Sequence, residues 1–241
     1  MSSLEAKKIA PATGTTVTLG AAGDTVAVSA TALKTNTIKD AGGNTIFSSN
    51  GSGTLSSVNS ALKGGLIFIS SQTATGAASI EFISGIDSTY NEYVFMFTNC
   101  NPATNDRDFQ ISFSDDAGSS YGVTKTTTFF RAAHSENNTT IAELAYQTGF
   151  DLAQSTAVQK ISHGVGGGAD ESTAGIVNLF NPASTAYVKN FYARTLTVQT
   201  NWAVDAYIAG YCNTTSAING VKFNFASSSN FDGTIAMYGT G

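Results

Sequence analysis

The acidic residues near the middle of the chain are the first candidates for chemistry, because carboxylate oxygens bind Ca²⁺ and serve as general acids and bases. Asp106, Asp108, Asp115 and Asp116 lie on the two connections that border one predicted strand. Their spacing is not that of an Asp-x-Asp-x-Asp-Gly loop, which would arrange the ligands around one ion. We therefore interpret them as solvated turn carboxylates and predict no metal site, with a Ca²⁺-binding turn as the alternative.

Two sequence patterns could indicate a hydrolase. A glycosidase needs two carboxyl groups about 5–9.5 Å apart across a cleft, and no motif places the glutamates of this chain in that way. Gly118-Ser119-Ser120-Tyr121-Gly122 matches a Gly-x-Ser-x-Gly nucleophile elbow, which requires a strand before it and a helix after it. Turn residues precede it here and β-prone Val123-Thr124 follows, so we predict a hairpin turn and no catalytic residue.

The histidines, cysteines and glycine-rich stretch give no cofactor site. His134 and His163 have polar or Gly neighbours and form no His-x-x-x-His pair, so we predict two surface loop histidines and no transition-metal site. Residues 164–168 lack the Lys-Ser/Thr ending of a phosphate-binding loop and are predicted to be a flexible loop. Cys100 and Cys212 are expected to be reduced thiols, although their positions near strand ends leave a bridge open.

Aromatic side chains beside turns are the remaining candidates for binding. Ring faces stack against the C–H faces of sugars, while neighbouring Asn and Asp bind hydroxyl groups, and tyrosine and tryptophan carry a polar handle on an apolar body. Taken singly, each member of the set is interpreted as a core or rim residue; the set is Tyr90, Tyr93, Tyr121, Tyr146, Tyr187, Tyr192, Tyr207, Tyr211 and Trp202. As a group they leave a receptor-binding role open, and the candidate receptor contacts are Tyr121, Tyr146, Tyr187 and Trp202.

Composition limits the partners. Charged residues make up 12% of the 241 residues, and the formal net charge is -5. This acidic balance gives no support to binding of nucleic acid or of an anionic membrane, both of which need a basic surface. No apolar run approaches the ~20 residues of a membrane helix, and residues 1–14 lack the apolar core of a secretory signal. We therefore expect a protein assembled in a cytoplasm, without nucleic-acid binding or membrane insertion.

Three strand-like runs, Ile80–Ile83, Tyr93–Phe97 and Phe109–Phe113, organise the second part of the chain. The second run is apolar on both faces, as in a central strand, and the third alternates, as in a strand with one buried face. Further strands are predicted at Thr126–Phe130, Val158–Ile161, Ile176–Phe180, Phe191–Val198, Val204–Tyr211, Val221–Phe225 and Thr234–Tyr238, while Ile141–Tyr146 fits strand or helix. The pattern predicts an antiparallel, jelly-roll-like β-sandwich over residues 66–241. The expected core residues are Phe95, Phe97, Phe109, Ile111, Phe113, Phe223, Phe225 and Ile235.

Residues 1–65 have a different character, with short β segments that hold few large apolar residues. The predicted segments are Thr16–Leu19, Thr25–Val28, Thr37–Lys39 and Thr45–Phe47, with helical turns at Ser2–Lys8 and Ser56–Lys63. Alone, such strands bury too little apolar surface to offset the conformational entropy cost of ordering, which is roughly 1–2 kcal/mol per residue. We predict an N-terminal shaft or attachment segment that gains its core by stacking on copies of itself, with a flexible leader as the alternative.

A family resemblance follows from the order of these motifs. Tyr90-x-x-Tyr93 begins an aromatic strand, followed by Pro102-Ala103-Thr104, by Phe109-x-Ile111-x-Phe113-Ser114 and by Asp116-x-Gly118-Ser119-Ser120-Tyr121. The chain closes with Ile218-Asn219-Gly220-Val221-Lys222-Phe223 and with residues 233–239, where Met237 stands at a usual Leu position. Over residues 66–241 this order resembles virion structural proteins of marine and cyanobacterial phages, namely tail fibres, head fibres and decoration proteins.

The resemblance implies a protein of the virion without enzymatic activity. Our first hypothesis is a homotrimeric tail fibre or spike, attached to other virion proteins by residues 1–65 and touching the host surface, for example a glycan, with its head. The alternatives are a capsid decoration or head-fibre protein and, less well supported by the motifs, a carbohydrate-active enzyme. No cofactor is implied.

Overall fold

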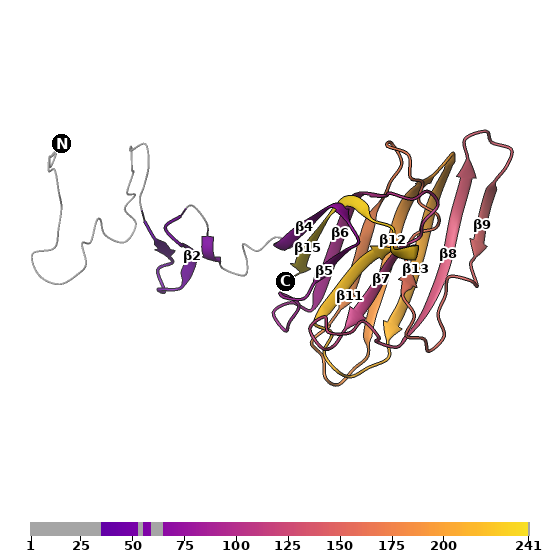
Figure 1. Ribbon diagram of the computed structural model, residues 1–241. Coiled ribbons are helices and arrows are strands. Elements are labelled where there is room, and N and C mark those ends of the chain that lie inside the picture. The colour runs from indigo at the N-terminus through magenta and orange to yellow at the C-terminus, as the bar shows by residue number, and fades with distance from the viewer. Residues whose placement is uncertain (1–34, 53–54, 59–64, 241) are drawn as a thin grey trace, which may run out of the picture. The chain divides into compact units, whose positions relative to one another are not determined.

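The computed structural model describes residues 35–52, 55–58 and 65–240. Within these ranges the chain forms β-strands and one short 3₁₀ helix, η2 (Ala226–Ser228), so the predicted all-β fold is confirmed (Figure 1). Contacts between residues divide the chain into two compact units, Met1–Asn59 and Ser60–Gly241. No helix in the described ranges is long and apolar enough to cross a membrane.

The N-terminal unit contains a three-stranded antiparallel sheet in the order β1-β2-β3. The strands are β1 (Thr37–Lys39), β2 (Thr45–Ser49) and β3 (Leu55–Val58). The turn between β1 and β2 is held by Asp40, whose Oδ1 accepts a hydrogen bond from the backbone N–H of Asn44 at 2.8 Å. Two of the four predicted N-terminal strands are therefore confirmed.

One prediction for the N-terminal unit is wrong, and three others concern residues outside the described ranges. A helical turn was predicted at Ser56–Lys63, but residues 55–58 form β3, paired with β2. Backbone pairing with a neighbouring strand has overridden a weak capping signal, as tertiary context often does. The predicted segments Ser2–Lys8, Thr16–Leu19 and Thr25–Val28 lie outside the described residues.

The C-terminal unit is an antiparallel β-sandwich of two unequal sheets. The larger sheet has eight strands in the order β4-β15-β6-β11-β12-β13-β8-β9, and the smaller has four in the order β10-β7-β14-β5. The strands of the larger sheet are β4 (Ile67–Ala77), β6 (Glu92–Pro102), β8 (Lys125–Ser135), β9 (Ala142–Tyr146), β11 (Thr173–Phe180), β12 (Lys189–Gln199), β13 (Trp202–Cys212) and β15 (Phe231–Thr240). Those of the smaller sheet are β5 (Ser79–Phe82), β7 (Phe109–Ser114), β10 (Gln159–Lys160) and β14 (Gly220–Phe225).

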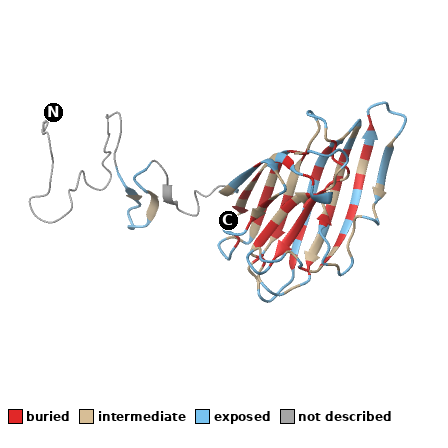
Figure 2. Ribbon diagram, viewed as in Figure 1, coloured by how far each residue is buried: buried red, intermediate tan, exposed pale blue. Residues whose placement is uncertain are grey.

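Aromatic rings fill the space between the two sheets. Phe97 of β6 lies 5.2 Å from Phe109 of β7, measured between ring centroids, and Phe113 of β7 lies 4.8 Å from Phe191 of β12. Buried and exposed residues alternate along the larger sheet, as Figure 2 shows, so one face of it belongs to the core. All eight predicted core residues are at most 1% exposed, which confirms them: Phe95, Phe97, Phe109, Ile111, Phe113, Phe223, Phe225 and Ile235.

The predicted role of β6 is confirmed, and that of β7 needs correction. β6 lies between β15 and β11 inside the larger sheet, as expected for a central strand. β7 was expected to bury one face, but all six of its residues are buried, including Gln110, Ser112 and Ser114. Two of these polar side chains have side-chain partners, because Gln110 Oε1 accepts a hydrogen bond from Asn224 of β14 at 3.1 Å and Ser114 donates to Asp116 at 2.7 Å.

Local details around the β8–β9 hairpin also differ from expectation. Residues 142–146, which fitted strand or helix, form strand β9 and pair with β8. β8 runs on to Ser135, so His134 belongs to a strand and not to a turn. Pairing with β8 makes residues 142–146 a strand. Pairing with β13, which continues opposite β8 as far as Trp202, extends β8 to Ser135.

Replacing Phe97 with Ala should lower the free energy of unfolding by ~3–5 kcal/mol, because the change leaves a cavity between the sheets. Urea unfolding followed by tyrosine and tryptophan fluorescence measures this. Tyr187→Ala is the matched control, since Tyr187 is 73% exposed and surface changes stay within about 0.5 kcal/mol. A loss below ~1 kcal/mol for Phe97→Ala would show that this ring does not join the sheets.

Candidate functional site

The four candidate receptor aromatics lie in different surroundings. The Tyr121 hydroxyl donates to Glu81 Oε2 at 3.1 Å, and Lys222 Nζ lies 5.2 Å from its ring centroid, beside the smaller sheet. Tyr146 belongs to β9, and its hydroxyl donates to Asp151 at 2.7 Å. Tyr187 lies in the connection between β11 and β12. Trp202 begins β13 and is partly buried.

The structure does not bring these four residues together into one site. Tyr187 precedes the first residue of β12, whereas Trp202 pairs with Gln199, the last residue of the same strand. Eleven residues of strand at about 3.3 Å each separate the two ends by about 35 Å. Tyr121 lies beside the other sheet, so these four aromatics share no common surface.

A different surface, the outer face of the larger sheet, gathers apolar side chains. We define it as the face that points away from the smaller sheet, between β9 and β11. Along β12 the residues alternate, with Phe191, Ala193 and Thr195 buried and Tyr192, Leu196 and Val198 exposed. The outward residues therefore share one side, because successive side chains of a strand point to opposite faces.

The strand register places aromatic side chains in a row across this outer face. Tyr146 pairs with Phe130, Phe130 with Tyr207, and Tyr207 with Arg194. The rings of Phe130 and Tyr207 are stacked, with centroids 4.9 Å apart and planes 4° apart. The guanidinium carbon of Arg194 lies 5.0 Å from the Tyr207 ring centroid, a favourable cation–π distance. The row thus runs over four neighbouring strands.

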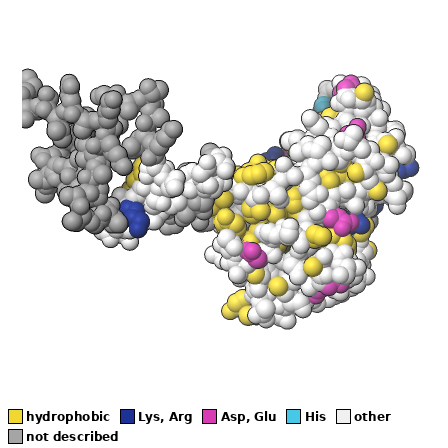
Figure 3. Space-filling model, turned by 60° about the vertical axis from the view of Figure 1, so that its left-hand side comes forward, with side chains coloured by type: hydrophobic (Ala, Val, Ile, Leu, Met, Phe, Trp, Pro, Cys, Tyr) yellow, Lys and Arg dark blue, Asp and Glu magenta, His cyan; other side chains and the backbone are white. Residues whose placement is uncertain are grey.

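The charges in the middle of the outer face satisfy each other. Arg194 Nη2 donates to Asp205 Oδ2 at 2.8 Å and Arg194 Nε donates to Asp205 Oδ1 at 3.1 Å. The Tyr207 hydroxyl donates to the same Asp205 Oδ2 at 3.1 Å. Such a two-point pairing of guanidinium and carboxylate leaves little demand for an outside partner. On the face of the C-terminal unit that Figure 3 presents, charged side chains are few among hydrophobic and other uncharged ones.

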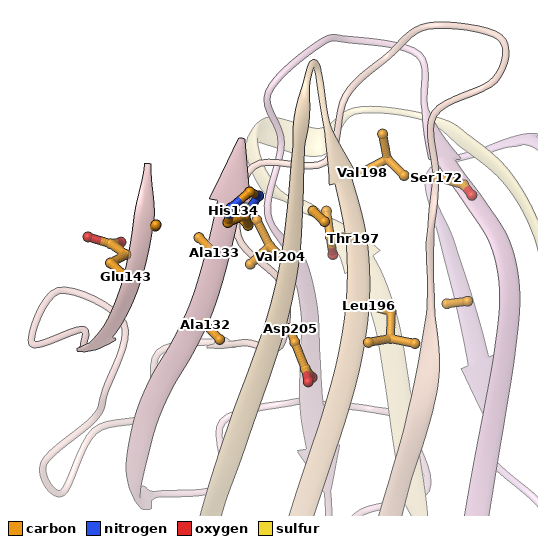
Figure 4. A pocket seen from close by; sticks show the side chains of 13 residues that line it. Ala132, Ala133, His134, Glu143, Ser172, Leu196, Thr197, Val198, Val204 and Asp205 are labelled. Carbon is orange, nitrogen blue, oxygen red and sulfur yellow. The ribbon is translucent and has the colours of Figure 1, made fainter. Parts of the chain in front are cut away.

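A groove of about 700 Å³ crosses the outer face near the ends of β8 and β12. Figure 4 shows side chains of β9, β8, β13 and β12 around it, with Leu196 and Val198 beside it. Alanines contribute much of its lining, and His134 and Glu143 stand toward the β9 side. The lining is therefore mainly aliphatic, suited to apolar side chains.

His163 has a structural role that the sequence did not predict. It was expected on the surface, but it is partly buried, with its ring 4.9 Å from that of Phe150. Its Nδ1 lies 2.6 Å from Arg131 Nη1 and 3.2 Å from Gln199 Oε1. Burial, and then the positive charge of Arg131, lower the pKa of His163 below its ordinary value. The neutral ring of His163 thus links the β10–β11 connection to Arg131 of β8 and to Gln199 of β12.

The acidic turns are engaged in local contacts. Asp108 forms an ion pair with Lys160 at 2.9 Å. Asp116 accepts hydrogen bonds from Ser114 Oγ at 2.7 Å and from the backbone N–H and Oγ of Ser120, both at 2.8 Å. These contacts lower the pKa of Asp116. Among the residues that the structure describes, no group of three or more His, Cys, Asp or Glu side chains is placed to hold a metal ion.

The Gly-x-Ser-x-Gly sequence is a turn, but not a hairpin. Residues 118–122 lie between β7 of the smaller sheet and β8 of the larger, so they connect the two sheets. No helix follows, because the next element is strand β8. Ser120 Oγ donates to Asp116 within this turn. The geometry is therefore not that of a nucleophile elbow.

The two cysteines are free and buried in different parts of the sandwich. Cys100 pairs with Thr173 beside one end of β12, and Cys212 pairs with Lys189 at the other. Burial raises the pKa of each thiol to about 12. The bridge that the sequence left open is absent from this structure.

Cys212 lies between two buried lysines that are distant from it in the sequence. The register pairs it with Lys189 of β12 on one side and Lys125 of β8 on the other, and all three are fully buried. Lys125 Nζ donates to the carbonyl of Val123 at 2.7 Å, and Lys189 Nζ to that of Thr214 at 3.1 Å. Burial lowers the pKa of both lysines. Their role is to close one end of the core.

Comparisons with known proteins add no family to this description. No family model, no curated protein and no solved structure matches the chain. The class that the fold defines is an all-β protein with an antiparallel β-sandwich.

Replacing Lys125 with Met should raise the melting temperature at pH 7, because a buried charge gives way to an apolar side chain of similar length. The pKa of Lys125 is lowered in the folded state from its ordinary 10.5, so the folded protein disfavours the charged form. The gain should therefore be largest at low pH and shrink as the pH rises toward 10.5.

Thermal melts of the wild type and of Lys125→Met between pH 6 and 10 measure this difference. Lys160→Met is the control, since Lys160 is partly exposed and paired with Asp108. A gain that stays constant with pH would contradict a role for the charge of Lys125.

Proposed function

We propose that this chain is a non-enzymatic structural subunit of a bacteriophage particle, a trimeric tail fibre or spike component. Residues 1–65 attach it to other virion proteins, and the C-terminal sandwich is the head that contacts the host surface. It is assembled in the host cytoplasm and resides in the virion. A capsid decoration or head-fibre protein is the alternative place in the particle.

The observation that carries this proposal is the open apolar outer face of the larger sheet. Phe130, Tyr192 and Leu196 on this face are 40%, 40% and 54% exposed. Soluble monomers rarely expose contiguous apolar areas of more than a few hundred Å², and larger ones mark contact surfaces. A subunit that spends its life packed against other virion components accounts for such a face.

The carboxylates of the sandwich support a structural role over hydrolysis. Four of them form ion pairs: Glu81 with Lys222 at 3.1 Å, Asp108 with Lys160 at 2.9 Å, and Glu143 with Arg131 and Asp205 with Arg194, both at 2.8 Å. A glycosidase instead needs a facing pair with one raised pKa. Incubation with host polysaccharide and a reducing-end assay test this, and release of reducing ends would favour the enzyme hypothesis.

The family resemblance supports the proposal through the same residues that form the core. Tyr93 of β6, Phe109 and Ile111 of β7, and Phe223 of β14 carry the motif, and each is fully buried. The residues of the motif thus lie on strands of both sheets, and their side chains pack in the core between the sheets. Host contact is assigned to exposed aromatics of the head, of which Tyr187 is 73% exposed and Tyr146 51% exposed.

Deleting residues 1–65 should leave a folded head that no longer joins the particle. The fragment from Leu66 keeps every strand of both sandwich sheets, and a domain of that length can bury most of its own core. Complementation of a phage that lacks the gene, followed by quantification of the protein in purified particles, measures incorporation. Circular dichroism of the purified fragment controls for folding.

Incorporation of this fragment at normal copy number would contradict an attachment role for residues 1–65. It would favour the decoration protein, in which the sandwich itself docks. A full-length chain carrying Tyr187→Ala is the matched control, since it should incorporate normally and lose only host adsorption.

A further inference from the structure

We propose that the outer face of the larger sheet binds a second copy of this same chain. This deepens the proposed function by naming the surface through which copies meet. It rests on that proposal only for the expected number of copies, which is three.

The outer face carries no excess of charge. Its described charged side chains between β9 and β11 are Arg194 and Asp205, which form an ion pair with each other, and Glu143 at the edge of the groove, which pairs with Arg131 at 2.8 Å. His134 lies at the margin of the face. A neutral face with paired charges can be desolvated without leaving an unpaired ion, which would be costly. It offers no excess charge to steer a charged partner, and its identical copy is equally neutral.

The outer face carries both protruding and recessed apolar features. Leu144 on β9 and Leu196 on β12 are 75% and 54% exposed, and they protrude as aliphatic side chains. Beside them lies the groove of about 700 Å³, lined in part by Ala132, Ala142 and Ala203. One copy therefore supplies side chains of the size that the groove of another copy can receive, as symmetric assemblies require.

The outer face is also extensive. β8, β12 and β13 are each eleven residues long, and β9 and β11 have five and eight residues. At about 3.3 Å per residue and about 4.8 Å between strands, five strands present roughly 700–800 Å². A stable protein interface buries about 800 Å² on each partner. The face is thus large enough for a lasting contact, whereas a short glycan would cover only part of it.

The test is the association of the full-length chain, measured by light scattering coupled to size-exclusion chromatography from 1 to 100 μM. Leu144→Glu and Leu196→Glu place a charge on the outer face at exposed positions, so folding should be retained and is checked by circular dichroism. Each should raise the dissociation constant about thirtyfold or more if it lies in the centre of the contact. Val158→Glu is the matched control, since Val158 is 40% exposed beside the smaller sheet.

A second measurement covers the case in which residues 1–65 alone hold the copies together. Leu196→Cys and Val158→Cys are reacted with a maleimide at 100 μM, with wild type as the blank because both native cysteines are buried. Leu196→Cys should react at least about tenfold more slowly than Val158→Cys, and slow reaction supports the interface even if the glutamate variants keep their mass.

Two results would overturn the proposal. One is a wild-type monomer at 100 μM, and the other is equal labelling of Leu196→Cys and Val158→Cys in an oligomer. A mass of two chains with Leu196→Cys protected would keep this interface and instead contradict the trimer of the proposed function.

Discussion

The packing of aromatic rings around Phe109 is the interaction on which the sandwich depends. Its ring lies 4.8–5.9 Å from the rings of Phe97, Phe223, Phe225 and Phe231. These rings come from β6, β7, β14 and β15, so the cluster joins both sheets. Aromatic pairs in such tilted, edge and stacked contacts add specific geometry to a large burial of apolar area. Fixing the smaller sheet on this cluster decides which face of the larger sheet is inside.

The unequal sheets explain why polar and ionisable groups occur at the margins of the core. Four strands face eight, so other segments complete the burial of β8 and β12. His163, bound to Arg131, joins one connection to the sheet, and Gln159 accepts a hydrogen bond from the buried Thr127. Lys125, Cys212 and Lys189 lie side by side on three neighbouring strands and cover one end of the core. Burial shifts the pKa values of His163, Lys125, Cys212 and Lys189 in the direction of their neutral forms, and the contacts of these groups are structural.

The outer face follows from the same asymmetry. Strands that are buried on one side alone usually alternate apolar with polar residues, but β8, β12 and β13 keep apolar residues on both sides. Stacked Phe130 and Tyr207, with Arg194 against Asp205, form a neutral surface whose polar groups are satisfied. Assembly gives a physical reason for such a surface, whereas a solitary domain would be more soluble with charges there.

The sequence by itself determined the all-β class, most of the strands and the core, because period-two alternation and turn residues are local signals. Phe97, Phe109 and Phe223 could be placed in the core in this way. Only the tertiary structure decided that Tyr187 and Trp202 lie at opposite ends of β12, since strand register is set by pairing between distant segments. The same holds for the row through Tyr146, Phe130 and Tyr207, whose members are far apart in sequence and meet only through that register.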